Sequence, residues 1–126
     1  MVFLCIKNKI IKIGNGINID NKLPIAKENS DKKTLNLIAV AQLADWHGYD
    51  RLIKAISKLD KDYKIRLKIV GDGYILSYLK NLTIELNLED KITFTGSLFD
   101  RDLDNAFDEM DIGVSSLGLY RKGLSE

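Results

Sequence analysis

Glycine turns with polar neighbours follow several apolar runs of the chain. Gln42-Leu-Ala-Asp-Trp-His-Gly48 stands between an apolar run and a helical pattern. A glycine at a helix start lets a ligand approach backbone N–H groups, and the helix N-terminus favours an anion. The Gln42 amide and a protonated His47 would add hydrogen bonds. This set is suited to binding a diphosphate, although a plain strand-to-helix loop with an exposed His47 accounts for the same residues.

Two further glycine turns have comparable positions. Gly71 and Gly73 flank an aspartate after the run that ends at Val70. Glycines there permit positive φ and the close approach of a ligand to the backbone; the alternative is a tight turn with Asp72 on the surface. Gly96 opens the turn Gly96-Ser-Leu-Phe-Asp-Arg101. In that turn Phe99 would wall a nucleotide base and Asp100 would cap the next helix.

The last twelve residues contain two adjacent cations and a final carboxylate. Arg121 and Lys122 are suited to binding phosphate or another anion. Glu126 would hold sugar hydroxyls or stabilise developing positive charge. A solvated tail is the alternative interpretation of residues 115–126.

Other kinds of site have little support. The chain has one histidine and one cysteine, Cys5, so we expect neither an internal disulfide nor a metal site. The spacing also gives no reason to place His47 beside a nucleophilic hydroxyl or thiol. Gly48 is the only glycine in its turn, so the spaced glycine fingerprint of NAD-binding proteins is missing.

Strand and helix patterns alternate along the chain and must position these turns. Four apolar runs typical of buried strands alternate with three amphipathic helical patterns, so the sequence predicts a Rossmann-like α/β fold. The fold would be an open parallel sheet with helices on both faces, in three α/β/α layers, and the strand exits would meet at one edge, where such sheets bind ligands. We expect strands at 9–13, 35–43, 65–73, 91–96 and 111–116, and helices at 48–59, 75–87 and 100–109. The apolar stripes of the first two helices are Leu52, Ile53, Ile56 and Leu59, and Ile75, Leu79, Leu82 and Leu86.

Composition narrows the class of protein. The 126 residues contain 19 Lys and Arg against 18 Asp and Glu, a balance that disfavours nucleic-acid binding. No run approaches the length of a membrane span, and the single cysteine suits a cytoplasmic protein. We expect a linker with a short strand at 1–34 and one domain at 35–126. Because the chain stops just after the last strand, we expect a truncated domain whose exposed sheet edge could pair chains into an oligomer.

Six segments, taken in order, resemble the donor-binding, C-terminal half of group 1 (family 4) glycosyltransferases of the GT-B fold. The resemblance covers about residues 9–126, and the ordered spacing is more specific than any one piece. The segments are Ile13-Gly-Asn-Gly-Ile17, Val40-Ala-Gln-Leu43, Trp46-His-Gly-Tyr-Asp-Arg-Leu-Ile53, Leu67-Lys-Ile-Val-Gly-Asp-Gly73, Ile92-Thr-Phe-Thr-Gly96 and Met110-Asp-Ile-Gly-Val-Ser115.

The resemblance implies an activity. The donor would be a UDP- or GDP-linked sugar held at the strand exits, with no metal or other cofactor. The full-length enzyme, of the hexosyltransferase type, would transfer the sugar with retention to a polysaccharide or glycan. The acceptor, a glycan or a lipid-linked one met at the inner face of the membrane, would bind an N-terminal domain that should precede residue 9. This chain alone would then be inactive.

The sequence also departs from the family pattern. Gln42 and His47 stand where the family commonly has an Arg and a Lys that contact the diphosphate. Arg121 and Lys122 are the candidates to replace that charge, and Glu126 stands where the first of two paired glutamates would fall. Two alternatives stay open: a noncatalytic, flavodoxin-like binding module, and an inactive gene fragment.

Overall fold

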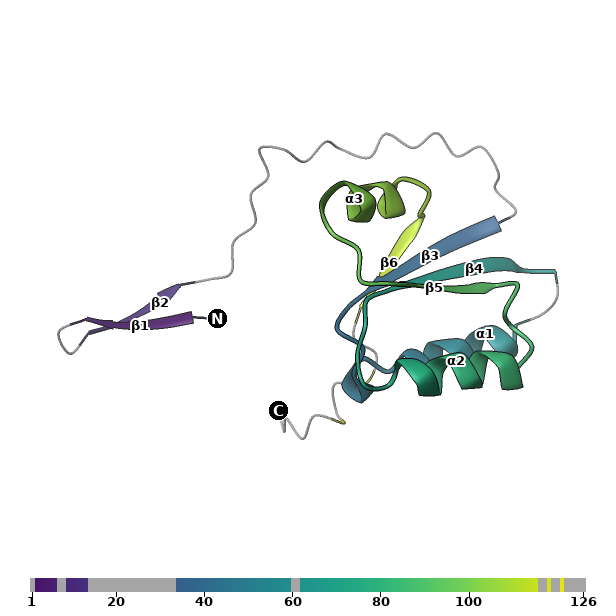
Figure 1. The fold of residues 1–126 in the computed structure, drawn as a ribbon, viewed down its shortest axis with the longest axis horizontal. Coiled ribbons are helices and arrows are strands. Elements are labelled where there is room, and N and C mark those ends of the chain that lie inside the picture. The colour runs from purple at the N-terminus through teal and green to yellow at the C-terminus, as the bar shows by residue number, and fades with distance from the viewer. Residues whose placement is uncertain are drawn as a thin grey trace.

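The computed structural model describes residues 2–6, 9–13, 34–59, 62–115, 118 and 121. Strands and helices alternate from residue 34 onward, as the sequence predicts (Figure 1). The elements are β1 (Val2–Ile6), β2 (Lys9–Ile13), β3 (Thr34–Val40), the 3-10 turn η1 (Asp45–His47), α1 (Tyr49–Ser57), β4 (Lys64–Val70), α2 (Leu76–Glu85), β5 (Ile92–Gly96), α3 (Asp100–Asp108) and β6 (Ile112–Val114).

The four strands from β3 to β6 form one parallel sheet with the order β5-β4-β3-β6. The chain moves outward from β3 through β4 to β5, and then crosses through α3 to place β6 on the other side of β3. The direction of winding therefore reverses between β3 and β6. In open α/β sheets this reversal leaves a crevice beside the carboxyl ends of the two strands.

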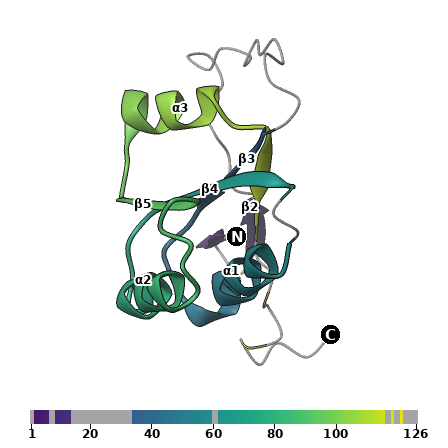
Figure 2. The same cartoon turned by 90° about the vertical axis from the view of Figure 1, so that its right-hand side faces the viewer.

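Helices cover both faces of this sheet. Figure 2 shows α1 and α2 on one face and α3 on the other. The larger core lies under α1 and α2, where Ile53 and Leu79 pack with Leu67 and Ile69. A smaller core lies under α3, where Ala106 packs with Ile38 and Val70. These contacts confirm the predicted open, three-layer arrangement.

Strand β3 is shorter than its apolar run. The run reads as a strand to Leu43, but the ladder ends at Val40 and the chain then turns through residues 41–44. Leu37, Ile38 and Ala39 are buried in succession, whereas Leu35 and Val40 are exposed. Only the middle of the strand is covered on both faces.

Helix α1 packs through most of the stripe that we expected, and Leu52 lies partly buried against the core as predicted. Ile53 and Ile56 are buried as predicted, but Leu59 lies beyond the helix and is 43% exposed. Tyr49, which was not predicted, has a fully buried side chain and packs in the core. The stripe of α2 is correct, since Leu79 and Leu82 are buried and Ile75 and Leu86 pack against the same core.

The N-terminal residues contain one strand more than the sequence predicts. Strand β1 pairs with β2 in an antiparallel two-stranded sheet, with Val2 opposite Ile13 and Ile6 opposite Lys9. Only β2 was expected, because the apolar run before it lacks clear alternation. Residues 14–33, which complete the predicted linker, lie outside the described residues.

Candidate functional site at the carboxyl edge of the sheet

The loops that follow β3, β4 and β5 lie side by side. The Ala41 N–H donates to the Val70 carbonyl at 3.1 Å, and the Leu43 N–H donates to the Asp72 carbonyl at 2.7 Å. On the other side of this loop, the Gly71 N–H donates to the Gly96 carbonyl at 2.8 Å. The glycine turns at 71, 73 and 96 therefore gather at one edge of the sheet, as the sequence predicts.

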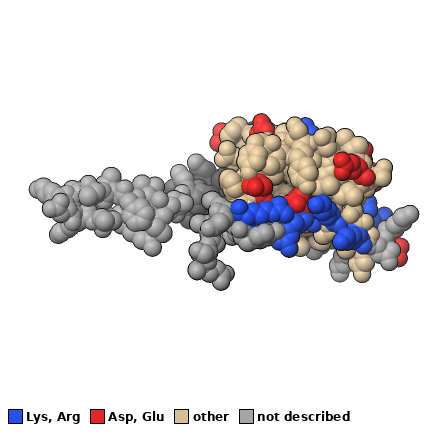
Figure 3. All heavy atoms as spheres, turned by 90° about the horizontal axis from the view of Figure 1, so that it is seen from below, with Lys and Arg blue, Asp and Glu red and all other residues tan. Residues whose placement is uncertain are grey.

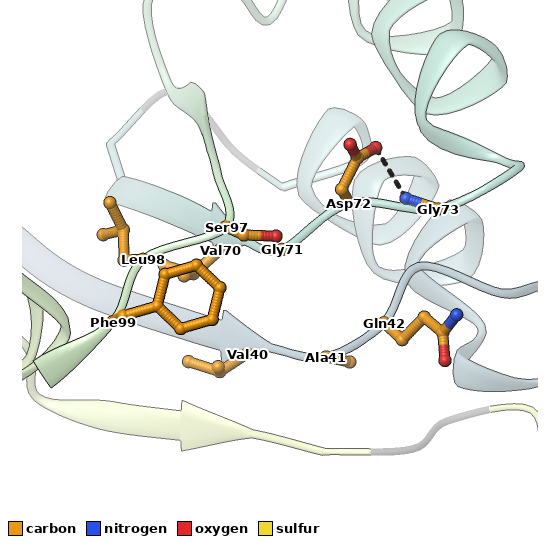
Figure 4. Close-up of a pocket in the computed structure, with 10 residues that line it drawn as sticks. All are labelled: Val40, Ala41, Gln42, Val70, Gly71, Asp72, Gly73, Ser97, Leu98 and Phe99. Atoms are coloured by element: carbon orange, nitrogen blue, oxygen red, sulfur yellow. Dashed lines mark hydrogen bonds between the residues drawn. The ribbon is translucent and has the colours of Figure 1, made fainter.

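A pocket of about 570 Å³ opens between these three loops (Figure 4). One end is apolar, with Leu98 and the ring of Phe99, which is 73% exposed. The other end is polar, and there the Asp72 carboxylate accepts a hydrogen bond from the Gly73 N–H at 2.7 Å. The described lining residues are Val40, Ala41, Gln42, Val70, Gly71, Asp72, Gly73, Ser97, Leu98 and Phe99.

The glycines of the second turn are required by the packing of the two loops. A Cβ at Gly71 would overlap the carbonyl oxygen of Ala41, and a Cβ at Gly73 would overlap that of Leu43. Gly71 also has φ +129°, which side chains rarely adopt. Both amide protons are already donated within the protein. Close approach thus occurs here between two protein loops, and ligand contact by these glycines stays a prediction.

The turn η1 next to the pocket is held by its own hydrogen bonds. The Asp45 carboxylate accepts from the Trp46 N–H at 2.9 Å and from the Tyr74 hydroxyl at 2.6 Å. The Gly48 N–H donates to the Asp45 carbonyl at 3.1 Å, and Gly48 has φ +69° where η1 meets α1. The Gly48 amide that we expected to face a diphosphate is therefore used inside the turn.

His47 lies in η1 and does not line the pocket. Its ring stacks on that of Tyr49, with centroids 5.7 Å apart and planes at 17°. Its Nδ1 atom is buried and has no hydrogen-bond partner in the described part of the chain. Gln42, by contrast, lines the pocket and is exposed.

Arg121 reaches the N-terminal end of α1 from the segment after β6. Its Nη1 atom donates to Asp50 Oδ1 at 2.8 Å, and its Nη2 atom donates to Asp50 Oδ2 at 3.2 Å. Burial raises the pKa of the Asp50 carboxyl, but the hydrogen bonds and charge of Arg121, helped by Lys54 and the Arg51 backbone, outweigh it, so that the pKa lies below its usual value. Sequence reasoning missed Asp50, although an acid in a first helical turn was visible.

The remaining predicted residues have mixed outcomes. Lys122 and Glu126 lie outside the described residues. Asp100 was expected to cap α3, but it is the first residue of that helix; Phe99 holds the cap position, and no side chain bonds to the cap. Tyr74, which fixes η1, was also missed because nothing local in the sequence connects it to Asp45.

None of the described residues that line the pocket is a lysine or an arginine. Figure 3 shows Lys and Arg side chains gathered on the face seen from below, the side on which α1 and α2 lie in Figure 1. The exposed cations of α1 are Arg51 and Lys54, and Lys58 follows directly after the helix. Among described residues, no cluster of three or more His, Cys, Asp or Glu side chains could hold a metal ion. The helices in the described ranges are too short or too polar to span a bilayer.

The open parallel sheet with its edge pocket defines a Rossmann-like domain of the kind found in GT-B glycosyltransferases. A family profile described as glycosyl transferases group 1 matches residues 20–119. The chain therefore belongs to the group 1 glycosyltransferases.

Relatives and solved structures agree with this assignment. An uncharacterized glycosyltransferase of Haemophilus influenzae is 38% identical over 88 residues, covering 69% of this chain and 24% of that protein. Mannosylfructose-phosphate synthase of Agrobacterium fabrum is 33% identical over 89 residues, covering 64% and 20%. The fold matches Anabaena HepE in complex with UDP (TM-score 0.53, 21% identity, 67% of this chain and 24% of that one) and in complex with UDP-glucose (TM-score 0.53, 21% identity, 64% and 22%). The chain spans about a fifth to a quarter of these proteins.

Proposed function

We propose that this chain forms the donor site of a retaining glycosyltransferase and binds a nucleotide-diphospho-sugar at the carboxyl edge of its sheet. The observation that carries the proposal is the pocket between the exits of β3, β4 and β5. An edge of this kind is where open α/β sheets bind their ligands. HepE, which shares the fold, is seen in complex with UDP and with UDP-glucose, which favours a UDP-linked hexose over a GDP-linked one.

The two ends of the pocket suit different parts of such a donor. The exposed ring of Phe99, beside Leu98, offers an apolar face on which a base would stack. The amide of Gln42 and the hydroxyl of Ser97 offer neutral hydrogen-bonding groups to the ribose or phosphate. Asp72 is the only charged residue of the described lining. A diphosphate at the polar end of the pocket would therefore have no cation of this lining beside it.

Catalysis would depend on stabilising the leaving group. A departing nucleoside diphosphate gains negative charge, and donors fixed in advance around it lower the barrier. We propose Lys122 as a cation for the diphosphate, because Gln42 and His47 stand where the family commonly has cations. We propose Glu126, by family resemblance, as the carboxylate that contacts the sugar. The acceptor, a polysaccharide, glycan or lipid-linked glycan, would be bound by a separate acceptor domain, so this chain is expected to bind the donor without transferring it.

Titration calorimetry of the 126-residue chain with UDP, GDP and AMP tests the proposal. A nucleoside diphosphate should bind and release heat in a saturable curve, while AMP should bind more weakly because it lacks the second phosphate. Gln42→Ala should weaken the binding of UDP. Asn81→Ala, which removes an exposed side-chain amide from α2 outside the pocket, is the matched control and should leave the binding unchanged. No heat with either diphosphate would contradict the proposal.

A further inference from the structure

An ion pair attaches Arg121, in the segment after β6, to Asp50 in the first turn of α1. Besides its two bonds to the Asp50 carboxylate, Arg121 donates from Nη1 to the carbonyl oxygen of Asp45 at 3.2 Å. The same guanidinium therefore connects the first turn of α1 with the first residue of η1. These elements follow β3 in the chain, whereas Arg121 follows β6, and the winding of the sheet reverses between those two strands.

The ion pair is partly sheltered from water. Asp50 is 8% exposed as a residue, and the Arg121 side chain is 27% exposed. Removing one partner of such a pair leaves the other charge without its compensation. Lys54 is a poor substitute, since its Nζ lies 3.9 Å from Asp50 Oδ2 and its side chain is 51% exposed.

A backbone contact lies beside the ion pair. A Cβ placed on Gly118 would lie 3.2 Å from the Cα of Gly48 and 3.4 Å from the carbonyl oxygen of Trp46. The segment after β6 thus touches the end of η1 directly. With Tyr74 bonded to Asp45 from the opposite loop, η1 is held from both sides.

We propose that Asp50 is a positioning residue of the donor site: by binding Arg121, it fixes the loop from Gln42 to Gly48 against the segment after β6. Asp50 itself contacts no ligand, and Arg121 acts through the protein and not on the phosphate. Because the pocket begins at Gln42, a loosened loop would hold the donor less tightly. This inference rests on the proposed function.

A double-mutant cycle on UDP affinity tests this role. We expect Asp50→Asn and Arg121→Gln each to weaken UDP binding by roughly 2- to 30-fold, the range found for residues that act through coupled networks. The double variant should be no weaker than the weaker single variant, because both changes remove the same connection. Lys54→Gln is the control: it removes a neighbouring cation, leaves the Arg121 bonds in place and should keep the affinity of the unmodified chain.

Two conservative variants keep the test valid if Asp50→Asn unfolds the chain. Asp50→Glu keeps the charge and should recover most of the affinity for UDP. Arg121→Lys also keeps the charge, but its ammonium cannot bridge both carboxylate oxygens, so this variant should stay weak. Unchanged or tighter UDP binding by Asp50→Asn, with loss in Arg121→Gln, would overturn the inference and make Arg121 a direct phosphate ligand. Failure of the unmodified chain to bind any nucleotide would instead overturn the proposed function, and this inference with it.

Discussion

Gly71 lies so close to Ala41 that a Cβ at position 71 would overlap the Ala41 carbonyl oxygen. Gly73 has the same relation to Leu43, two residues further along both loops. These contacts extend the pairing of β3 and β4 beyond the end of the ladder, through the hydrogen bonds of Ala41 and Leu43. The wall of the pocket formed by the two loops therefore depends on the absence of side chains at both glycines.

Replacing Gly71 by alanine should destabilise the domain. The change adds a strained backbone conformation, about 1–3 kcal/mol, and an overpacked contact, again about 1–3 kcal/mol. Gly96→Ala is the control, since Gly96 has φ +75° but its Cβ would meet no atom within 4 Å. Urea unfolding should show a clearly larger loss for Gly71→Ala. Equal losses would mean that the two loops separate at no cost.

The Asp50–Arg121 pair should make stability depend on pH in the acid range. The pKa of Asp50 is lowered in the folded protein, so the stabilisation is complete above the carboxyl's ordinary pKa of about 3.9 and is lost as pH falls through the lower, folded value. The difference in unfolding free energy between the unmodified chain and Asp50→Asn should be constant near neutrality. It should shrink as the pH falls below about 4. A difference that does not change with pH would show that the carboxylate charge is not involved.

Phe99 should contribute to nucleotide binding and not to folding. Its ring is 73% exposed at the apolar end of the pocket. Loss of a stacked base costs about 1–3 kcal/mol, so Phe99→Ala should raise the Kd for UDP roughly 5- to 150-fold. Tyr63→Ala removes another exposed ring, which does not line the pocket, and should leave the Kd unchanged. Equal effects of the two substitutions would rule out stacking on Phe99.

Tyr74 should hold η1 in place up to alkaline pH. Its hydroxyl donates to the Asp45 carboxylate and accepts from the Asp45 N–H, and the first of these bonds raises the pKa of the phenol above its usual value. Tyr74→Phe should speed amide hydrogen exchange at Asp45 and Trp46, while Tyr78→Phe should not. In the unmodified chain the protection should persist through about pH 10 and be lost as the pH rises through the folded pKa. Unchanged exchange in Tyr74→Phe would contradict the contact.

The sequence predicts the layers and the order of the elements well because burial determines both. The apolar stripe of α2 points inward as expected, and unbroken apolar runs form parallel strands. The predicted end of β3 was wrong. Ala41 and Leu43 look like strand residues, but they lie in the loop after β3, where they bond to the loop that contains Gly71 and Gly73. Local pattern cannot show such pairing between loops, nor could it show the ladder between β1 and β2.

The sequence predicts where the residues of the candidate site lie better than it predicts which groups they contact. Gln42, Gly71 and Gly73 were expected at one edge, and they line one pocket there. The use of the Gly48 N–H within its own turn could not be foreseen, nor could the pairing of Arg121 with Asp50 across 71 positions of sequence. Both depend on tertiary contacts that spacing along the chain does not encode.

Two-dimensional NMR of the 126-residue chain during titration with UDP tests the central claim most directly. We predict saturable shifts of the amide signals of residues 40–42, 71–73 and 97–99, the three stretches that line the pocket. The amide signals of residues on the outer face of α1, such as Lys54, should not shift. Spectra that do not change with UDP or GDP, or shifts confined to residues away from those three loops, would contradict a donor site at this edge of the sheet.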